Sequence, residues 1–204
     1  MPFPVTRVLD DFQRTDEGPP PSASWVDSYG GGIEVKTNEC GTDDAINGGG
    51  GSWNTSFGVN QECFLTIVVP PGVDSIINLR IRTALATDRD SDHYEIDILP
   101  VAVANDVAQF WKRVSAVWTQ MGADVDLGGE ITAGEQYGIR GIGSNLEGFR
   151  DGVSLGTRTD SDVTSAGFIG VEVADILLRF DNFGGGQLAG LPFCHRPNQA
   201  VLAR

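Results

Sequence analysis

Short apolar runs alternate with polar residues along most of this chain, and glycine, proline, asparagine or aspartate separates the runs. Period-two alternation bounded by turn residues is typical of β-strands. The expected strands are residues 7–12, 32–38, 62–69, 76–84, 93–99, 110–117, 121–127, 136–142, 146–150, 153–160, 167–173 and 176–183. The pattern therefore predicts an all-β protein.

Two stretches depart from this alternation. Residues 103–114 place apolar side chains at helix-like spacing, and we interpret them as a turn-rich insertion or a strand. Residues 48–51 are all glycine and predict a flexible insertion, which makes Trp53 the tryptophan expected to be most exposed. Trp111 and Trp118 stay open between the core and a contact surface.

The order of turns and strands near the C-terminus carries a family resemblance. Its landmarks are Asn145-Leu146, the hairpin signal Asp151-Gly152, Ala166-Gly167-Phe168-Ile169-Gly170 and Phe180-Asp181-Asn182-Phe183. Together with the opening Val8-Leu9-Asp10-Asp11-Phe12 and Trp25, this order resembles the concanavalin A-like lectin/glucanase jelly roll. The resemblance implies an antiparallel β-sandwich over residues 1–186 whose first and last strands lie side by side, followed by a tail or docking arm at 187–204.

The composition of the chain limits the classes of partner that it could bind. The 204 residues fit one sandwich domain, and the net charge of −14 excludes the basic footprint that nucleic-acid binding needs. No run approaches the ~20 apolar residues of a membrane span, so no membrane insertion is expected. The N-terminus carries no signal-peptide pattern, which predicts a chain made in a host cytoplasm. Cys40 and Cys63 are predicted to be free thiols, with a disulfide between them as the alternative; Cys194 makes the count odd.

One motif suggests catalysis, the run His93-Tyr94-Glu95-Ile96-Asp97-Ile98-Leu99-Pro100. It resembles the catalytic strand of laminarinase-type β-glucanases, Glu-x-Asp-x-x-Glu or Glu-x-Asp-x-Glu, which implies a nucleophile at Glu95. Leu99 and Pro100 occupy both positions where the acid/base glutamate could stand. We therefore predict that the protein is not an enzyme. Glu95 and Asp97 share one strand face and are interpreted, with Trp53, as candidate glycan-binding residues.

Acidic residues raise the question of a metal. Residues 88–92 alternate aspartates as a calcium loop does, but His93 and Leu99 break the EF-hand pattern. The family resemblance instead implies a structural calcium between the terminal strands, held by Asp10 or Asp11 together with Asp181. The expectation is accordingly no cofactor, or this one calcium ion.

The absent signal peptide and the opening Asp-Asp-Phe resemble tailed-phage virion proteins. That resemblance implies a non-enzymatic virion structural or accessory protein, a tail, receptor-binding or capsid-decorating subunit, located in the virion. Its partners would be other virion subunits, a homo-oligomer with a trimer as the favoured state, and a cell-surface glycan. The tail supplies the predicted oligomer contacts: Leu188, Leu191, Phe193, Val201 and Leu202. The alternatives are a carbohydrate-binding lectin-like module and, last, an atypical β-glucanase.

Overall fold

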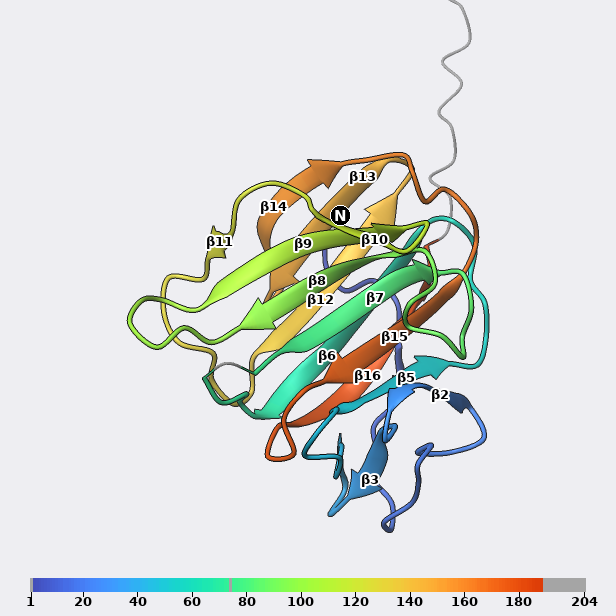
Figure 1. Cartoon of the computed structure of the whole chain (residues 1–204), viewed down its shortest axis with the longest axis vertical. Helices are drawn as coiled ribbons and strands as arrows, with labels where there is room; N and C mark the ends of the chain where they lie inside the picture. The colour runs from blue at the N-terminus through green and yellow to red at the C-terminus, as the bar shows by residue number, and fades with distance from the viewer. Residues whose placement is uncertain (1, 74, 189–204) are drawn as a thin grey trace, which may run out of the picture.

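The computed structural model describes residues 2–73 and 75–188, which form two antiparallel sheets packed face to face (Figure 1). Within these residues there is no helix, and hence none long and apolar enough to cross a membrane. The predicted all-β antiparallel sandwich is confirmed.

The first sheet has the strand order β14-β13-β12-β6-β16-β4-β3, with β1 also paired to β16. Its strands are β1 (Val8–Asp10), β3 (Glu34–Lys36), β4 (Glu39–Gly41), β6 (Gln61–Val69), β12 (Gln136–Ile142), β13 (Asn145–Arg150), β14 (Val153–Thr159) and β16 (Arg179–Gln187).

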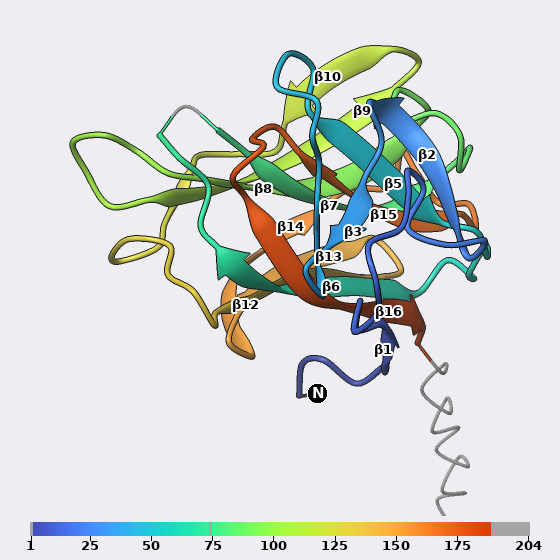
Figure 2. The ribbon, with the colours of Figure 1, turned by 90° about the horizontal axis from the view of Figure 1, so that it is seen from below.

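The second sheet has the order β10-β9-β8-β7-β15-β5-β2, with β11 also paired to β9. Its strands are β2 (Trp25–Gly30), β5 (Gly49–Trp53), β7 (Ile77–Thr83), β8 (His93–Leu99), β9 (Val107–Val114), β10 (Val117–Gln120), β11 (Val125–Asp126) and β15 (Phe168–Val173). Figure 2 shows the two layers from the side, with β6, β12 and β16 below β7, β8 and β9.

The core lies between the sheets because strand residues alternate between two faces. On β8, for example, Tyr94, Ile96 and Ile98 are almost fully buried in it. Side chains at the positions between them point to the opposite face of the sheet, away from the core. The polar residues of β7, β8 and β15 thereby gather on one outer surface, which positions the site described below.

The terminal strands are paired as expected, with Val8 of β1 opposite Gly184 of β16. The last strand was predicted to end too early, at residue 183, because residues 184–186 continue β16 along β6. Glycine is required at 184, where a Cβ atom would collide with the Phe64 ring. Leu188 also belongs to the fold: it is 3% exposed and its N–H donates to Asn60 O.

Leu188 is therefore not the exposed oligomer contact that the sequence predicts, because its apolar surface is already covered by its own chain. The other predicted contacts, Leu191, Phe193, Val201 and Leu202, lie outside the described residues.

The prediction for the glycine-rich segment before Trp53 is wrong. It is not a flexible insertion but strand β5, hydrogen-bonded between β2 and β15. A Cβ atom on Gly51 would lie 2.7 Å from Ile33 Cδ1, and one on Gly49 would overlap the carbonyl oxygen of Gly32. Only glycine permits this approach of a second chain segment.

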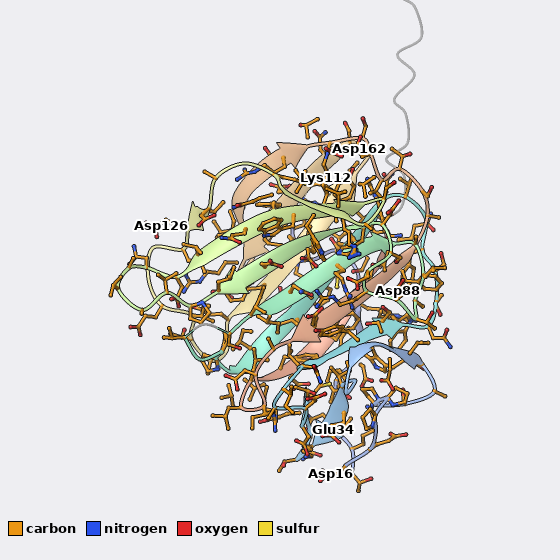
Figure 3. The ribbon with its side chains drawn as sticks, viewed as in Figure 1. Asp16, Glu34, Asp88, Lys112, Asp126 and Asp162 are labelled. Atoms are coloured by element: carbon orange, nitrogen blue, oxygen red, sulfur yellow. The ribbon has the colours of Figure 1, made fainter. Side chains whose placement is uncertain are left out.

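Other local predictions are resolved by the same pairing. The ambiguous window at 103–114 contains strand β9. Of the strand expected at 121–127, only residues 125–126 form a strand, β11, and β10 ends before it at Gln120. Cys40 and Cys63 are buried free thiols, as favoured, and β16 separates their strands. At the rim, Lys112 Nζ lies 2.6 Å from Asp162 Oδ2 (Figure 3), and Lys112 also pairs with Asp160, which joins β9 to the loop after β14.

Candidate functional site

A hollow of about 360 Å³ opens on the outer face of the second sheet, the sheet nearest the viewer in Figure 3. This volume lies within the ordinary range of small-molecule sites. The residues that line it come from β7, β8, β9, β10 and β15 and from adjoining loops: Ile76, Asn78, Arg89, Glu95, Asp97, Trp111, Trp118 and Glu172.

Strand register sets the polar floor of the hollow. Asn78 of β7 lies opposite Asp97 of β8 on one side and opposite Glu172 of β15 on the other. Glu95 lies two residues from Asp97 and faces the same way. Three carboxyl groups from two strands therefore gather around one asparagine, and all four side chains belong to residues no more than 7% exposed.

Asp97 is the most perturbed of these acids. Burial raises the pKa of Asp97 well above its usual range, and the charge of Glu95 and a hydrogen bond between the two carboxyl groups raise it further. Two adjacent carboxylates repel each other when both are ionised. This repulsion favours a pair that holds one proton over a pair of two ionised carboxylates.

His93 continues the row on β8. Its Nδ1 lies 2.7 Å from the carbonyl oxygen of Ser91, and its Nε2 lies 3.2 Å from Glu95 Oε2. A carbonyl oxygen only accepts, so Nδ1 carries a hydrogen, and the Nε2–Glu95 contact then needs a second proton on one of its partners. The fully buried His93 thus orients Glu95 from the side opposite Asp97.

Two arginines offset the acids. Arg80 is fully buried, and its Nη2 donates to Ser28 Oγ at 2.8 Å. Burial lowers the pKa of Arg80, against the raising effect of Glu172 and Glu95. Arg89 lies over the Tyr29 ring, 4.1 Å from its centroid, and pairs with Glu172.

Burial raises the pKa of Glu172, while Arg80 and Arg89 act to lower it. The backbone N–H of Arg89 donates to Ser28 O, which ties the loop containing Asp88 (labelled in Figure 3) to strand β2. The arginine side of the hollow is thereby fixed by both backbone and side-chain contacts.

Trp111 and Trp118 form the aromatic wall. Both are half-buried, and their rings meet edge to face with centroids 6.5 Å apart. Trp111 Nε1 donates to Gln109 Oε1 at 3.0 Å, while His93 and Arg113 flank Trp118. Indole rings held in this way present apolar surface next to polar groups, an arrangement suited to an amphipathic ligand.

Several buried polar atoms at the hollow have no partner. They are Asn78 Oδ1, Asp97 Oδ1, Arg80 Nε, Arg80 Nη1 and Arg89 Nε. Unpaired buried polar groups cost about 1–3 kcal/mol each, so their gathering at one place lowers the stability of this part of the fold.

The structure brings together two of the three predicted glycan-binding residues, Glu95 and Asp97. Trp53 lies elsewhere: it is partly buried against the core, with its ring centroid 5.6 Å from that of Trp25. The sequence did not predict Asn78, Glu172 and Arg89 as residues of the site. Asn78 and Glu172 alternate with apolar residues along their strands, as residues on an outward face do. Only the pairing of β7 with β8 and β15 shows that both lie on the same face as Glu95 and Asp97.

The predicted calcium ligands Asp10 and Asp181 have different surroundings. Asp10 accepts hydrogen bonds from Arg14 Nη1 at 2.6 Å and Trp25 Nε1 at 2.9 Å. These bonds outweigh the effect of burial and lower the pKa of Asp10. Burial, with Asp11 nearby, raises the pKa of Asp181. Over residues 2–73 and 75–188 no group of three His, Cys, Asp or Glu could hold an ion.

Solved structures place this architecture among known folds, although the sequence matches no protein-family model and no curated protein. A Bacillus subtilis protein of unknown function with a galectin-like fold is 11% identical with TM-score 0.66, over 92% of this chain and 98% of that one. The β-glucanase of Bacillus licheniformis is 14% identical with TM-score 0.60, over 88% and 97%.

Carbohydrate binding module CBM66 from Bacillus subtilis is also similar, 14% identical with TM-score 0.56 over 80% of this chain and 96% of that one. The fold is therefore a concanavalin A-like jelly roll, shared with glucanases and carbohydrate-binding modules. Identities this low carry the fold and not the activity.

Proposed function

We propose that this protein is a carbohydrate-binding module whose outer sheet face, the hollow between Trp111 and Glu172, holds a glycan. The observation that carries the proposal is the hollow itself, in which polar side chains of β7, β8 and β15 lie beside the rings of Trp111 and Trp118. Sugars combine an apolar ring face with hydroxyl donors, which matches both features. The similarity to CBM66 supports the same class of ligand.

Binding without hydrolysis is part of the proposal. Leu99 and Pro100 follow the Glu95-Ile96-Asp97 segment where a second glutamate would be needed. Glu172 is a third carboxyl group in the hollow, but Arg89 pairs with it. The charge of Arg89 acts to lower the pKa of Glu172, against the raising effect of burial, so it opposes the protonated form that a general acid needs.

A binding measurement tests the proposal. Isothermal titration calorimetry with laminaritetraose, cellotetraose, mannotetraose and xylotetraose is expected to find at least one ligand. Trp111→Ala is expected to weaken that ligand roughly tenfold or more, since a lost ring contact removes both apolar area and shape. Ser154→Ala, on β14 of the other sheet, is the matched control and should bind as the wild type does. Equal binding by Trp111→Ala and wild type would place the glycan elsewhere.

The virion setting is a narrower proposal. A glycan-binding sandwich is compatible with a receptor-binding subunit of a phage tail, and the resemblance of the opening segment supports that location. Co-purification with virions, detected by mass spectrometry of gradient-purified particles, tests it. Absence from the particles would leave the glycan-binding proposal standing and remove the virion one.

A further inference from the structure

The hollow is small compared with an oligosaccharide. Its volume of about 360 Å³ lies near the lower end of the roughly 300–1,000 Å³ that small-molecule sites span. A tetrasaccharide bound there extends out of the hollow, either across Arg89 and Glu172 toward β2 or across Trp111 toward β10. The contacts at these two ends differ.

The end of the hollow at β15 is closed by the loop that carries Arg89. Arg89 pairs with Glu172, and its guanidinium lies over the Tyr29 ring of β2. The same loop is held on its other side, where Arg113 Nη1 lies 2.5 Å from Asp90 Oδ1. A chain of sugars that left the hollow in this direction would have to displace a loop that is fixed from both sides.

The end of the hollow at Trp111 adjoins a row of polar side chains. Trp111 Nε1 donates to Gln109 Oε1 at 3.0 Å, and Gln109 Nε2 donates to Asp124 Oδ1 at 3.0 Å. Gln120 lies directly opposite Trp111 in the pairing of β10 with β9, and its Nε2 donates to the same Asp124 oxygen at 2.6 Å. An indole N–H only donates and a carboxylate only accepts, so both amide groups have a single consistent orientation.

This orientation leaves two acceptors that a ligand can reach. Among the hydrogen bonds within residues 2–73 and 75–188, none ends on Gln120 Oε1 or Asp124 Oδ2. Asp124 is exposed and Gln120 is partly exposed, and neither oxygen is among the buried polar atoms without a partner. Both oxygen atoms can therefore accept a hydrogen bond from a hydroxyl group that comes from solvent.

The loop between β10 and β11, which carries Asp124, is held in place from the first sheet. Arg158 of β14 donates from Nε to Met121 O, and from Nη2 to Ala123 O at 2.9 Å. A second hollow of about 270 Å³ lies past β10, and Gln120 and Arg158 are among the residues that line it. The two acceptors are thus fixed before a ligand arrives and lie beside free space, which lowers the entropic cost of binding.

We propose that the glycan site continues past Trp111, and that Gln120 and Asp124 form a second subsite, which accepts hydrogen bonds from hydroxyl groups of the sugar units outside the hollow. This inference rests on the proposed function and adds the direction in which the bound chain runs, from β15 across β8 and β9 to β10. The ligand is then an oligosaccharide or polysaccharide chain and not a single sugar.

Oligosaccharides of two lengths test the subsite. Isothermal titration calorimetry compares laminaribiose, cellobiose, mannobiose and xylobiose with the corresponding tetrasaccharides. The wild type should bind its tetrasaccharide at least about fivefold more tightly than the disaccharide, because only the longer chain reaches the added acceptors. Gln120→Ala and Asp124→Ala should each weaken the tetrasaccharide roughly three- to tenfold and leave the disaccharide within about twofold of the wild type, since each removes one hydrogen bond outside the hollow. Thermal unfolding of each variant checks that it is folded.

Two further variants serve as controls. Asp126→Ala, on β11 (labelled in Figure 3), also removes one carboxylate and should bind both lengths as the wild type does. A loss confined to the tetrasaccharide in Tyr29→Ala would place the rest of the chain at the β2 end and overturn the inference. Equal affinities of the two lengths in the wild type, or losses in Gln120→Ala and Asp124→Ala that are absent or equal for both lengths, would overturn it while leaving a glycan site at Trp111. If the wild type binds none of these saccharides, the proposed function is rejected and the inference with it.

Discussion

Glu95 and Asp97 lie side by side on one face of β8, and burial together with the charge of Glu95 raises the pKa of Asp97 well above its usual range. This relationship carries a cost in stability. An acid whose pKa is raised on folding favours the native state most strongly below the pKa of the unfolded chain, near 4. That contribution is lost as pH rises toward the folded pKa. The pair, and not one residue, is what titrates.

We therefore expect Asp97→Asn to stabilise the protein increasingly as pH rises from about 4 toward neutrality, by about 1.4 kcal/mol for each unit of pKa shift removed. Urea unfolding followed by tryptophan fluorescence across pH 4–8 measures the difference. Glu130→Gln, at an exposed acid, is the control for removing one carboxyl group. A flat profile for Asp97→Asn would show that Asp97 ionises normally.

Glu62 anchors the N-terminal segment to strand β6. Its Oε1 accepts hydrogen bonds from Val5 N at 2.7 Å, Thr6 N at 2.6 Å and Thr6 Oγ1 at 2.7 Å, and the residue is fully buried. Glu62→Gln should destabilise the protein by about 1–3 kcal/mol, because a neutral amide weakens three bonds to a charged acceptor.

The loss at Glu62 is measured by the same urea titration, with Glu130→Gln again as the control for removing one negative charge. Hydrogen exchange should also rise at Val5 and Thr6 in Glu62→Gln. An unchanged exchange rate there would contradict the anchoring role.

Residue pattern alone predicts strands well where side chains alternate. Residues 93–99 and 136–142 coincide with β8 and β12, and the turn Asp151-Gly152 lies between β13 and β14. It fails for β5, since glycine has no side chain to show alternation, and for the Gly184–Gly186 part of β16, for the same reason. In both places the neighbouring chain segment packs so closely that there is no room for a side chain.

Part of the candidate site could be predicted from the sequence. Glu95 and Asp97 stand on one strand, where period-two spacing reveals a shared face. Asn78 and Glu172 reach the same hollow only through the order β8-β7-β15, in which strands far apart in the sequence lie side by side. No local sequence pattern shows that these strands are neighbours.

The glycine explanation of β5 leads to a prediction with a matched control. Gly49→Ala should destabilise the protein strongly, by several kcal/mol or to the point of not folding, because the new methyl group overlaps the backbone oxygen of Gly32, which cannot move freely. Gly129→Ala has nothing within 4 Å of the added Cβ and should change stability by less than about 1 kcal/mol. Thermal unfolding of both variants decides the matter, and equal melting temperatures would show that β5 is not packed as described.

Hydrolysis provides the last prediction, because the hollow contains three carboxyl groups even though β8 lacks the second glutamate. We expect no turnover of laminarin or lichenan by the wild type, measured as reducing ends released over a day. The physical reason is that β8 carries no second glutamate and that Arg89, paired with Glu172, opposes protonation of that acid. Arg89→Met removes the cation and should raise the pKa of Glu172 further, since burial already raises it. This variant should still be inactive if the site only binds. Reducing ends from the wild type that disappear in Glu172→Gln would show instead that β15 supplies the acid missing from β8.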